Sequence, residues 1–136
     1  MKTAELYIQL ERATGKMQEA LTFPNDEPHK ESTIQRFEYT FELSWKLMSS
    51  IIKDQGIESY GVRNVLREGY KLQLIDNVEV WFKYADARNQ TAHIYRQSVA
   101  DEVVSVARGG FVEHVKALIE KESQYIIGGE VEEGDK

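Results

Sequence analysis

Residues 32–52, STIQRFEYTFELSWKLMSSII, contain the pattern that most clearly specifies the fold. Their apolar side chains recur in steps of three or four, at Ile34, Phe37, Phe41, Trp45, Met48 and Ile52. This spacing is typical of one buried face of an α-helix. Ser32 and Gln35 form a capping-box pattern that predicts the start of the helix, and Gly56 predicts its end. A helix of about 20 residues is about 30 Å long, enough to span a small domain, so this stretch indicates a helical bundle.

Outward from this stretch, the same spacing predicts four further helices. They cover about Thr3–Leu21, Gly61–Leu74, a stretch that begins at Asp76, and about Ser98–Tyr125. We expect the Asp76 side chain to cap the first turn of the fourth helix, and the Glu79 side chain to accept a hydrogen bond from the Asp76 backbone N–H in return. Tyr70 in the third helix and Ala92 in the fourth are expected to pack inward.

The predicted fifth helix contains two unusual segments. Val103-Val104-Ser105-Val106 is rich in β-branched residues, which favour strands, but the three-and-four spacing continues beyond it and favours a helix. Gly109 and Gly110 each cost a helix about 1 kcal/mol relative to alanine, so the pair indicates either a close helix approach or a break. Together these elements predict an all-α, up-and-down four-helix bundle with an additional short helix, about five helices in all.

Length and composition restrict the class of protein. With 136 residues, of which 41% are hydrophobic and 29% charged, the chain has room for one folded domain. We expect that domain at residues 1–127 and an acidic, disordered tail at 128–136. The lack of cysteine excludes a disulfide scaffold, a thiolate zinc site and a cysteine nucleophile. We expect neither a secretory signal nor a membrane span, and a cytoplasmic location fits.

Several common catalytic motifs do not occur in the sequence. It contains no Gly-rich phosphate loop, no His-Glu-x-x-His, no Gly-x-Ser-x-Gly and no acidic metal-binding triplet, so we expect no metal or cofactor. The net charge of −6 argues against a surface that binds nucleic acid throughout. Residues 60–96 differ, because six basic side chains against four acidic ones give a local charge of +2 and leave −8 on the rest.

A basic stripe lies within this segment. Arg63, Arg67 and Lys71 follow one another at intervals of four, so they share a face of the predicted third helix. The stripe is either an ordinary solvated helix face or a surface for an anionic ligand or an acidic partner. The sequence leaves both interpretations open.

Of the three histidines, His93 is the strongest candidate for acid-base chemistry. His29 lies in a predicted loop between two prolines and is expected to be a solvated residue. His114 lies on an apolar stripe and is expected to be a core residue with one hydrogen bond. His93 follows Arg88 by five positions, which is a rotation of about 140°, so the two do not share a face of an ideal helix. They converge if the helix loosens near its end, or if two copies meet across a two-fold axis.

Arg88 and His93 together have the groups needed to cleave RNA without a metal. A neutral imidazole can take the proton of a ribose 2′-hydroxyl, and a guanidinium can stabilise the charge that forms on the attacked phosphate. DNA lacks that hydroxyl and would be inert. The structural alternative is a salt bridge from Arg88 to Asp86 or Glu79, with His93 at a helix end.

The residues around this pair form a longer pattern. Asn89 follows the arginine and Tyr95 stands two after the histidine, which completes Arg-Asn-x-x-x-His-x-Tyr. With this pattern and the stretch Phe37-Glu38-Tyr39-Thr40-Phe41-Glu42-Leu43-Ser44-Trp45-Lys46, the chain resembles the nucleotidyltransferase substrate-binding proteins of the HEPN superfamily. The resemblance runs from residue 37 to 95 and, more loosely, over most of the chain. It implies a small helical bundle, usually a homodimer, that pairs with a separately encoded minimal nucleotidyltransferase.

The resemblance also implies roles for individual residues. Arg88 and His93 match the catalytic pair of a metal-independent ribonuclease, and Asn89 matches the polar residue that follows the arginine. Tyr95 matches a tyrosine that the nucleotidyltransferase can adenylylate. In many such pairs the ribonuclease is a toxin and the nucleotidyltransferase is its antitoxin.

The older family name implies a second role, as a non-catalytic subunit that binds nucleotide and completes the partner's active site. In that role Arg63, Arg67 and Lys71 would face the triphosphate or the partner's acidic surface. A third hypothesis is a helical interaction protein that keeps Arg88 and His93 as interface groups. The sequence does not decide among the three.

Overall fold

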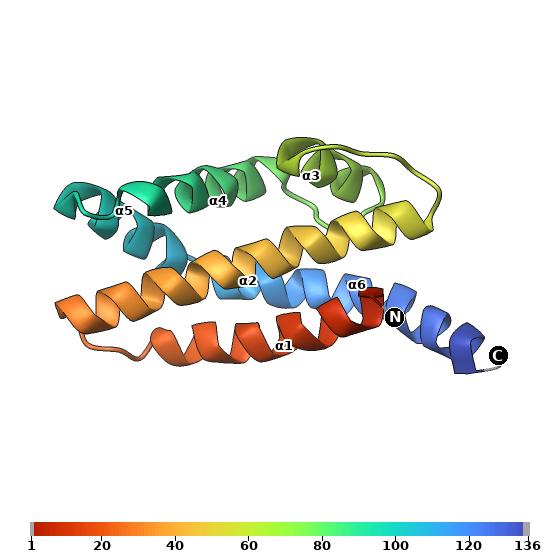
Figure 1. The fold of residues 1–136 in the computed structure, drawn as a ribbon, viewed down its shortest axis with the longest axis horizontal. Coiled ribbons are helices and arrows are strands. Elements are labelled where there is room, and N and C mark those ends of the chain that lie inside the picture. The colour runs from red at the N-terminus through yellow and green to blue at the C-terminus, as the bar shows by residue number, and fades with distance from the viewer. Residues whose placement is uncertain (1, 135–136) are drawn as a thin grey trace.

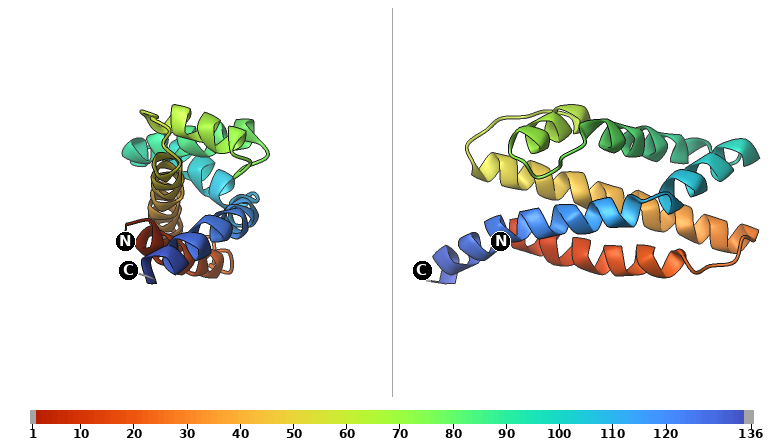
Figure 2. Two further views of the ribbon diagram at one scale, coloured as in Figure 1. Left: turned by 90° about the vertical axis from the view of Figure 1, so that its right-hand side faces the viewer. Right: turned by 180° about the vertical axis from the view of Figure 1, so that it is seen from behind.

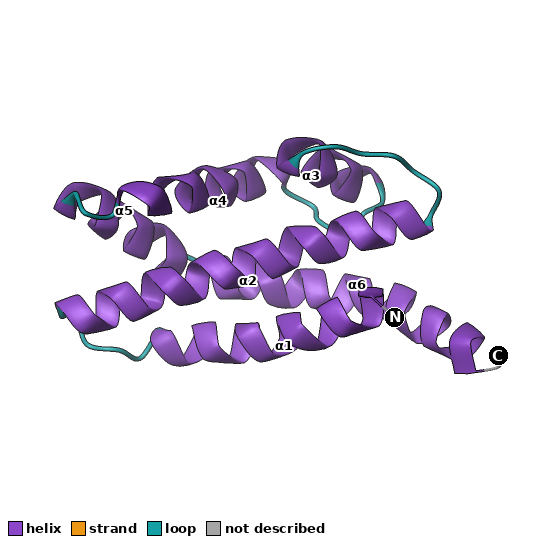
Figure 3. Cartoon of the chain, in the orientation of Figure 1, coloured by secondary structure: helices purple, strands orange, loops and turns teal. Residues whose placement is uncertain are grey.

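The computed structural model describes the backbone of residues 2–134 and the side chains of residues 2–126. This part of the chain contains six α-helices, one short 3-10 helix and no strand, which confirms the all-α prediction (Figures 1 and 3). The elements are α1 (Lys2–Ala20), α2 (Glu27–Asp54), α3 (Val62–Lys71), α4 (Val78–Gln90), η1 (Thr91–His93), α5 (Gln97–Arg108) and α6 (Phe111–Gly134).

Four long helices form the up-and-down bundle. Helices α1, α2, α4 and α6 run in alternating directions along the long axis, with α2 between α1 and α4 (Figure 1). Seen from behind, α6 covers the seam between α1 and α2 (Figure 2). The short helices α3 and α5 lie in the two connections, so the bundle has two additional short helices rather than the one expected.

The start of α2 differs from the prediction. Asp26 is the N-cap, its side chain accepts a hydrogen bond from the His29 backbone N–H at 3.0 Å, and Pro28 lies in the first turn. The capping box predicted at Ser32 is therefore wrong. Proline is well suited to the first turn of a helix, where its missing N–H would have no partner, so the helix begins five residues earlier than Ser32.

Helix α4 also has a different cap from the one predicted. Asn77, not Asp76, is the N-cap, and its side chain accepts from the Val80 N–H at 3.1 Å. Two residues expected to pack inward do not, because Tyr70 is 50% exposed and Ala92 is exposed. Ala92 lies outside α4, in η1, where the helical spacing no longer places it against the bundle.

The predicted fifth helix is two helices. Its first half, including the β-branched run, forms α5, and the chain turns at Gly109 before α6 begins at Phe111. Gly110 has φ 95°, a conformation that side-chain-bearing residues rarely adopt. The glycine pair therefore marks a break, which lets α6 pack along α1 while α5 contacts α2 and α4.

The core is centred on aromatic residues from three helices. The Phe111 ring lies 4.7 Å from Phe37 and 4.9 Å from Tyr84 between ring centroids, and Trp81 lies 5.4 Å from Tyr84. All four side chains are almost fully buried. Edge-to-face contacts of this kind add to the free energy of burial, so this aromatic cluster joins α2, α4 and α6.

A buried carboxyl group lies within α6. Glu122 is 0% exposed, and neither of its carboxyl oxygens has a hydrogen-bond partner among the described residues. Burial raises the pKa of this carboxyl well above its ordinary value. The folded chain consequently keeps this proton at pH values where the unfolded chain has lost it.

Glu122 is expected to make the protein less stable as pH rises. Between the ordinary carboxyl pKa and the raised folded value, the folded state binds more protons than the unfolded state, so the free energy of unfolding falls with increasing pH. Glu122→Gln is expected to remove this fall and to be about 1–3 kcal/mol more stable than the wild type at alkaline pH. Urea denaturation at acidic and alkaline pH measures the difference. Parallel pH profiles for the two proteins would contradict the prediction.

Candidate functional site

The last turn of α4 and the segment after it contain the residues singled out by the sequence. Arg88 and Asn89 lie in the final turn of α4, which ends at Gln90. The chain then continues as the 3-10 helix η1, with His93 at its end. The α-helix therefore ends between Arg88 and His93, and the turn that follows it is a 3-10 turn rather than a loosened α-turn. A 3-10 turn is tighter than an α-turn and so changes the angle between the two side chains.

Arg88 is held by carboxylates of α2. Its Nε donates to Glu42 Oε1 at 2.6 Å, and its Nη2 lies 3.8 Å from Glu38 Oε2. Thr91 adds to the same contact, since its hydroxyl lies 3.1 Å from Glu38 Oε2 and 2.7 Å from the Arg88 carbonyl. The end of α4 is thus attached to the middle of α2 through polar side chains.

The partners of Arg88 differ from those in the structural alternative. Arg88 forms its ion pairs with Glu38 and Glu42, and with neither Asp86 nor Glu79. Asp86 instead forms an ion pair with Arg63 at 2.7 Å. Asp86 precedes Arg88 by two positions, a rotation of about 200°, so it lies on the far side of the helix. Glu42 and Glu38 were not identified as site residues from the sequence. Their spacing of four on α2 was a usable signal, since it places both carboxylates on one helix face.

His93, Tyr95 and Arg96 lie in one closed turn. The Arg96 N–H donates to the His93 carbonyl at 3.1 Å, which fixes the residues between them. Ile94 is half-buried and packs against the core, while the other three side chains are exposed. The His93 and Tyr95 rings are 6.1 Å apart between centroids, and the Arg96 guanidinium lies 5.8 Å from the Tyr95 ring centroid.

Arg88 and His93 have different partners within the chain. Arg88 faces α2, and no hydrogen bond or ion pair joins it to His93 in the described part of the chain. Asn89 is exposed beside them. Tyr95 is 75% exposed, and its hydroxyl has no hydrogen-bond partner among the described residues. The structure therefore presents a histidine and a tyrosine to solvent, next to an arginine whose orientation is set by Glu42.

The basic stripe has local partners and lies apart from Arg88. Arg63 and Arg67 both stack on Phe82 of α4, with guanidinium carbons 4.6 and 5.3 Å from the ring centroid. Arg63 also pairs with Asp86, and Lys71 pairs with Glu68 at 3.1 Å. Arg63 thus helps to dock α3 on α4, on the side opposite Arg88. All three side chains of the stripe are nevertheless exposed.

The other two histidines have structural partners. The His29 ring contacts Asp26 Oδ1 at 2.6 Å, within the first turn of α2 rather than in the loop that was predicted. His114 makes one hydrogen bond, to the Tyr84 hydroxyl at 2.6 Å, as the structural interpretation predicted. Tyr84 is buried, and burial together with the nearby Glu113 carboxylate raises the pKa of its phenol to about 12. The phenol therefore stays protonated at neutral pH and links α4 to α6.

Metal-binding clusters and membrane-spanning helices do not occur among the described residues. No three His, Cys, Asp or Glu side chains gather there as a metal site would require. None of the helices in that part of the chain has an apolar stretch long enough to cross a lipid bilayer.

The chain matches known proteins over most of its length. The model of the family described as nucleotidyltransferase substrate binding protein like matches residues 5–124. Over 72 residues the chain is 38% identical to a probable ribonuclease HepT from Haemophilus influenzae. That match covers 49% of this chain and 49% of the relative, so it spans about half the length of the curated protein.

Two solved structures have a similar fold. One, from Thermus thermophilus, has a TM-score of 0.69 at 24% identity and covers 86% of this chain and 98% of its own, which shows a shared fold alone. The other, from Haemophilus influenzae, has a TM-score of 0.66 at 27% identity and covers 89% and 96%. It is described as revealing the fold of a substrate binding domain of a nucleotidyltransferase.

Proposed function

Since the chain belongs to the nucleotidyltransferase substrate binding protein-like family, we propose that it is the helical subunit of a two-component module and acts as a metal-independent endoribonuclease. Its partner would be a minimal nucleotidyltransferase encoded nearby, with the pair working as toxin and antitoxin in the cytoplasm. The observation that carries the proposal is the exposed His93, held in a closed turn that follows the helix containing Arg88. The 38% identity to a probable ribonuclease HepT supports it.

The proposed reaction is a transfer within the RNA chain. His93 takes the proton of a ribose 2′-hydroxyl, and the 2′-oxygen attacks the adjacent phosphorus. The bond from phosphorus to the 5′-oxygen of the next nucleotide breaks, that oxygen takes a proton from solvent, and His93 then releases to solvent the proton it took. The products are a 2′,3′-cyclic phosphate and a 5′-hydroxyl. Arg88 would stabilise the negative charge that builds up on the phosphate oxygens, and the exposed amide of Asn89 could orient the phosphate.

We propose a homodimer as the active form. In one protomer Arg88 and His93 are separate, so a two-fold axis that brings two such pairs to one cleft would assemble a complete site. The folded domain would comprise residues 1–127. The acidic tail at 128–136 stays a prediction, because its side chains lie outside the described residues. The backbone of α6 continues to Gly134.

Tyr95 provides a means of control in this scheme. Its hydroxyl is exposed and free of hydrogen bonds among the described residues, so a partner enzyme could reach it. Adenylylation would attach a bulky, anionic group two residues from His93 and block the approach of RNA. Tyr95 in its unmodified form would help to position the scissile phosphate.

The experiment that tests the function is cleavage of labelled single-stranded RNA by the purified protein in EDTA. Cleavage is expected to continue under chelation and to leave a 2′,3′-cyclic phosphate, which mass spectrometry of the products identifies. A control DNA of the same sequence is expected to stay intact. Hydrolysis of both polymers, or loss of cleavage in EDTA, would contradict the proposed chemistry.

The second candidate function is a non-catalytic subunit that binds nucleotide and completes the partner's active site. The family description favours it, as does the similarity to the Haemophilus influenzae structure of a substrate binding domain. Arg67 and Lys71, both exposed, would then contact the triphosphate or the partner's acidic surface, with Arg63 holding α3 in place. No cleavage by a folded dimer, together with weaker association after charge reversal of Arg67 and Lys71, would support this function over the first.

Glu42 is expected to be a positioning residue for Arg88. It binds Nε and leaves Nη1 without a partner in the described structure, so the outer edge of the guanidinium can receive a phosphate. Glu42→Ala is expected to lower kcat about 10-fold with little change in KM, because Arg88 loses its orientation. Glu42→Gln keeps a hydrogen-bond acceptor and should recover most of the rate.

Steady-state cleavage kinetics measure this effect, and two results would argue against it. Glu42→Ala could cleave as fast as the wild type, or Glu42→Gln could be as slow as Glu42→Ala. In the second case the charge of Glu42, rather than the orientation of Arg88, would be the cause. The pH profile of kcat is expected to keep its shape in both variants, because His93 is unchanged.

A further inference from the structure

Arg88 and the charged side chains around it, called here the Arg88 cluster, together carry no net charge. Arg88 lies beside Glu38 and Glu42, and Lys46 Nζ lies 4.0 Å from Glu42 Oε2. Two cations and two carboxylates make this cluster neutral at neutral pH. A polyanion such as RNA is attracted by unpaired cations, so the cluster by itself offers it little attraction.

Arg96 is an unpaired cation of the same surface. It forms no ion pair with any described residue, and its side chain is exposed. The nearest acidic residue that follows it, Asp101, is occupied by Lys30 at 3.2 Å and by Gln97 at 3.0 Å. The Arg96 guanidinium therefore keeps its hydrogen-bond donors for a ligand.

The turn fixes the backbone of Arg96 relative to that of His93. The hydrogen bond between the Arg96 N–H and the His93 carbonyl closes the turn, and half-buried Ile94 anchors it to the core. The Arg96 carbonyl accepts from the Val99 and Ala100 N–H groups at 3.0 Å, which ties the turn to α5. The Tyr95 ring lies 5.8 Å from the Arg96 guanidinium and 6.1 Å from the His93 ring, so a phosphate bound by Arg96 would lie on the same turn as the histidine.

We infer that Arg96 binds an RNA phosphate next to the scissile one, an inference that rests on the proposed ribonuclease function. Arg88 then acts on the phosphate that reacts, while Arg96 holds the neighbouring phosphate and places the intervening ribose at His93. A guanidinium suits this role because its donors match two phosphate oxygens at once. The ligand is single-stranded RNA, whose unpaired backbone can bend around an exposed turn.

Binding of RNA by inactive protein tests the inference. The probe is a fluorescein-labelled single-stranded oligonucleotide, and His93→Ala serves as the parent so that the probe stays intact. Adding Arg96→Gln is expected to weaken binding about 5- to 10-fold and to reduce the salt dependence of log K by about 0.7, the value for one phosphate contact on a single strand. Fluorescence anisotropy over about 50–200 mM salt measures both quantities.

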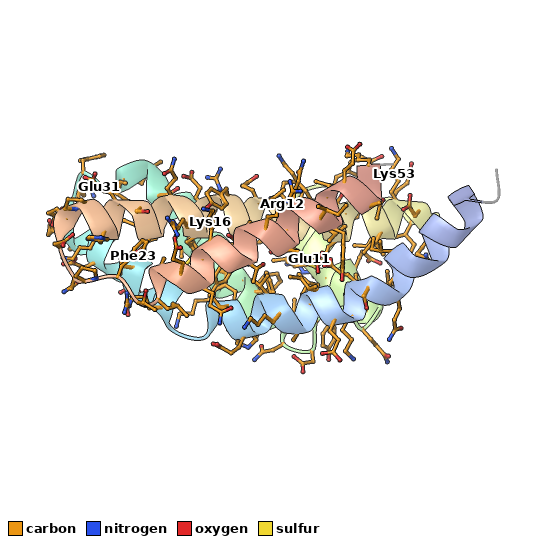
Figure 4. The ribbon with its side chains drawn as sticks, turned by 90° about the horizontal axis from the view of Figure 1, so that it is seen from below. Glu11, Arg12, Lys16, Phe23, Glu31 and Lys53 are labelled. Carbon is orange, nitrogen blue, oxygen red and sulfur yellow. The ribbon has the colours of Figure 1, made fainter. Side chains whose placement is uncertain are left out.

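Arg12→Gln in the same parent is the matched control. Arg12 is exposed on α1 and, like Arg96, pairs with no carboxylate among the residues described (Figure 4). Helix α1 lies on the other side of α2 from α4 (Figure 1). Loss of the Arg12 charge is therefore expected to change the affinity for RNA less than 2-fold. Equal affinities for parent and Arg96→Gln, equal losses for Arg12→Gln and Arg96→Gln, or no RNA binding by the parent would each overturn the inference.

Cleavage kinetics separate this inference from the proposed function. A dinucleotide contains only the scissile phosphate, so Arg96→Gln in the active protein should cleave it at the wild-type rate. A longer RNA should be cleaved with a kcat/KM about 5- to 10-fold lower, through KM. If the wild type cleaves RNA and Arg96→Gln matches it on both substrates, the function stands and the role of Arg96 is wrong. If the wild type cleaves neither, the proposed function fails, and the anisotropy result then tests only whether Arg96 binds an RNA phosphate.

Discussion

Replacing His93 with alanine is expected to lower the rate of RNA cleavage about 100- to 10,000-fold, the range usual for loss of a general acid or base. The protein is expected to remain folded. His93 is exposed, and its one described ring contact is with Tyr95, so the substitution should change the free energy of unfolding by less than about 0.5 kcal/mol. Initial rates on labelled single-stranded RNA and urea denaturation of both proteins measure the two effects.

The matched control for His93→Ala is His29→Ala. It also removes one imidazole, but His29 is held by Asp26 in the first turn of α2 and lies outside the turn that contains Tyr95. We expect it to retain cleavage while losing some stability. His93→Ala protein that still forms cyclic phosphate at the wild-type rate would exclude His93 from the reaction. A large loss of stability in His93→Ala would instead assign the residue a structural role.

Phe111→Ala is expected to have the largest effect on stability, a loss of about 3–5 kcal/mol in the free energy of unfolding. Phe111 is 0% exposed and contacts aromatic rings of both α2 and α4. Removing its ring leaves a cavity where three helices meet, and the residue directly follows the break at Gly110, where the start of α6 depends on this contact. A loss of this size is a large part of the stability of a small domain.

Urea denaturation at a fixed protein concentration measures the loss, with the slope m expected to stay unchanged. Tyr70→Ala is the control, since it also removes an aromatic ring but from a side chain that is 50% exposed. It is expected to cost less than about 1 kcal/mol. If Phe111→Ala costs no more than Tyr70→Ala, the aromatic cluster does not hold α6 in the bundle.

Local sequence patterns predicted the buried face of a helix correctly but did not predict where the helix begins. The face of α2 was predicted correctly, because a spacing of three and four is repeated many times along the helix. Its start was not, because several residues near Ser32 can cap a helix and the longer alternative at Asp26 also satisfies its N–H groups. The same ambiguity between Asp76 and Asn77 displaced the predicted cap of α4 by one residue.

Some of the candidate functional residues were likewise identified from the sequence, and others only from the structure. Arg88 and His93 were identified from their spacing and from a resemblance that the family match supports. Glu42, which orients Arg88, is 46 positions away in the sequence, and no local pattern relates the two. Arg63 lies on the face predicted from the sequence, but only its contacts with Asp86 and Phe82 show that it docks α3 on α4.

The sequence by itself determined that this chain is a helical bundle, which side of α2 is buried, and that one arginine and one histidine are the candidates for chemistry. The helical properties follow from residue types at short, repeated spacings, whereas the arginine and the histidine were singled out by one motif and by the resemblance that it carries. Only the tertiary structure decided that the glycine pair is a break rather than a close approach, that Glu42 holds Arg88, and that Arg96, in the turn that begins at His93, forms no ion pair with the described residues. Those outcomes depend on which helix faces meet, and this is set by packing of the whole core rather than by any one segment.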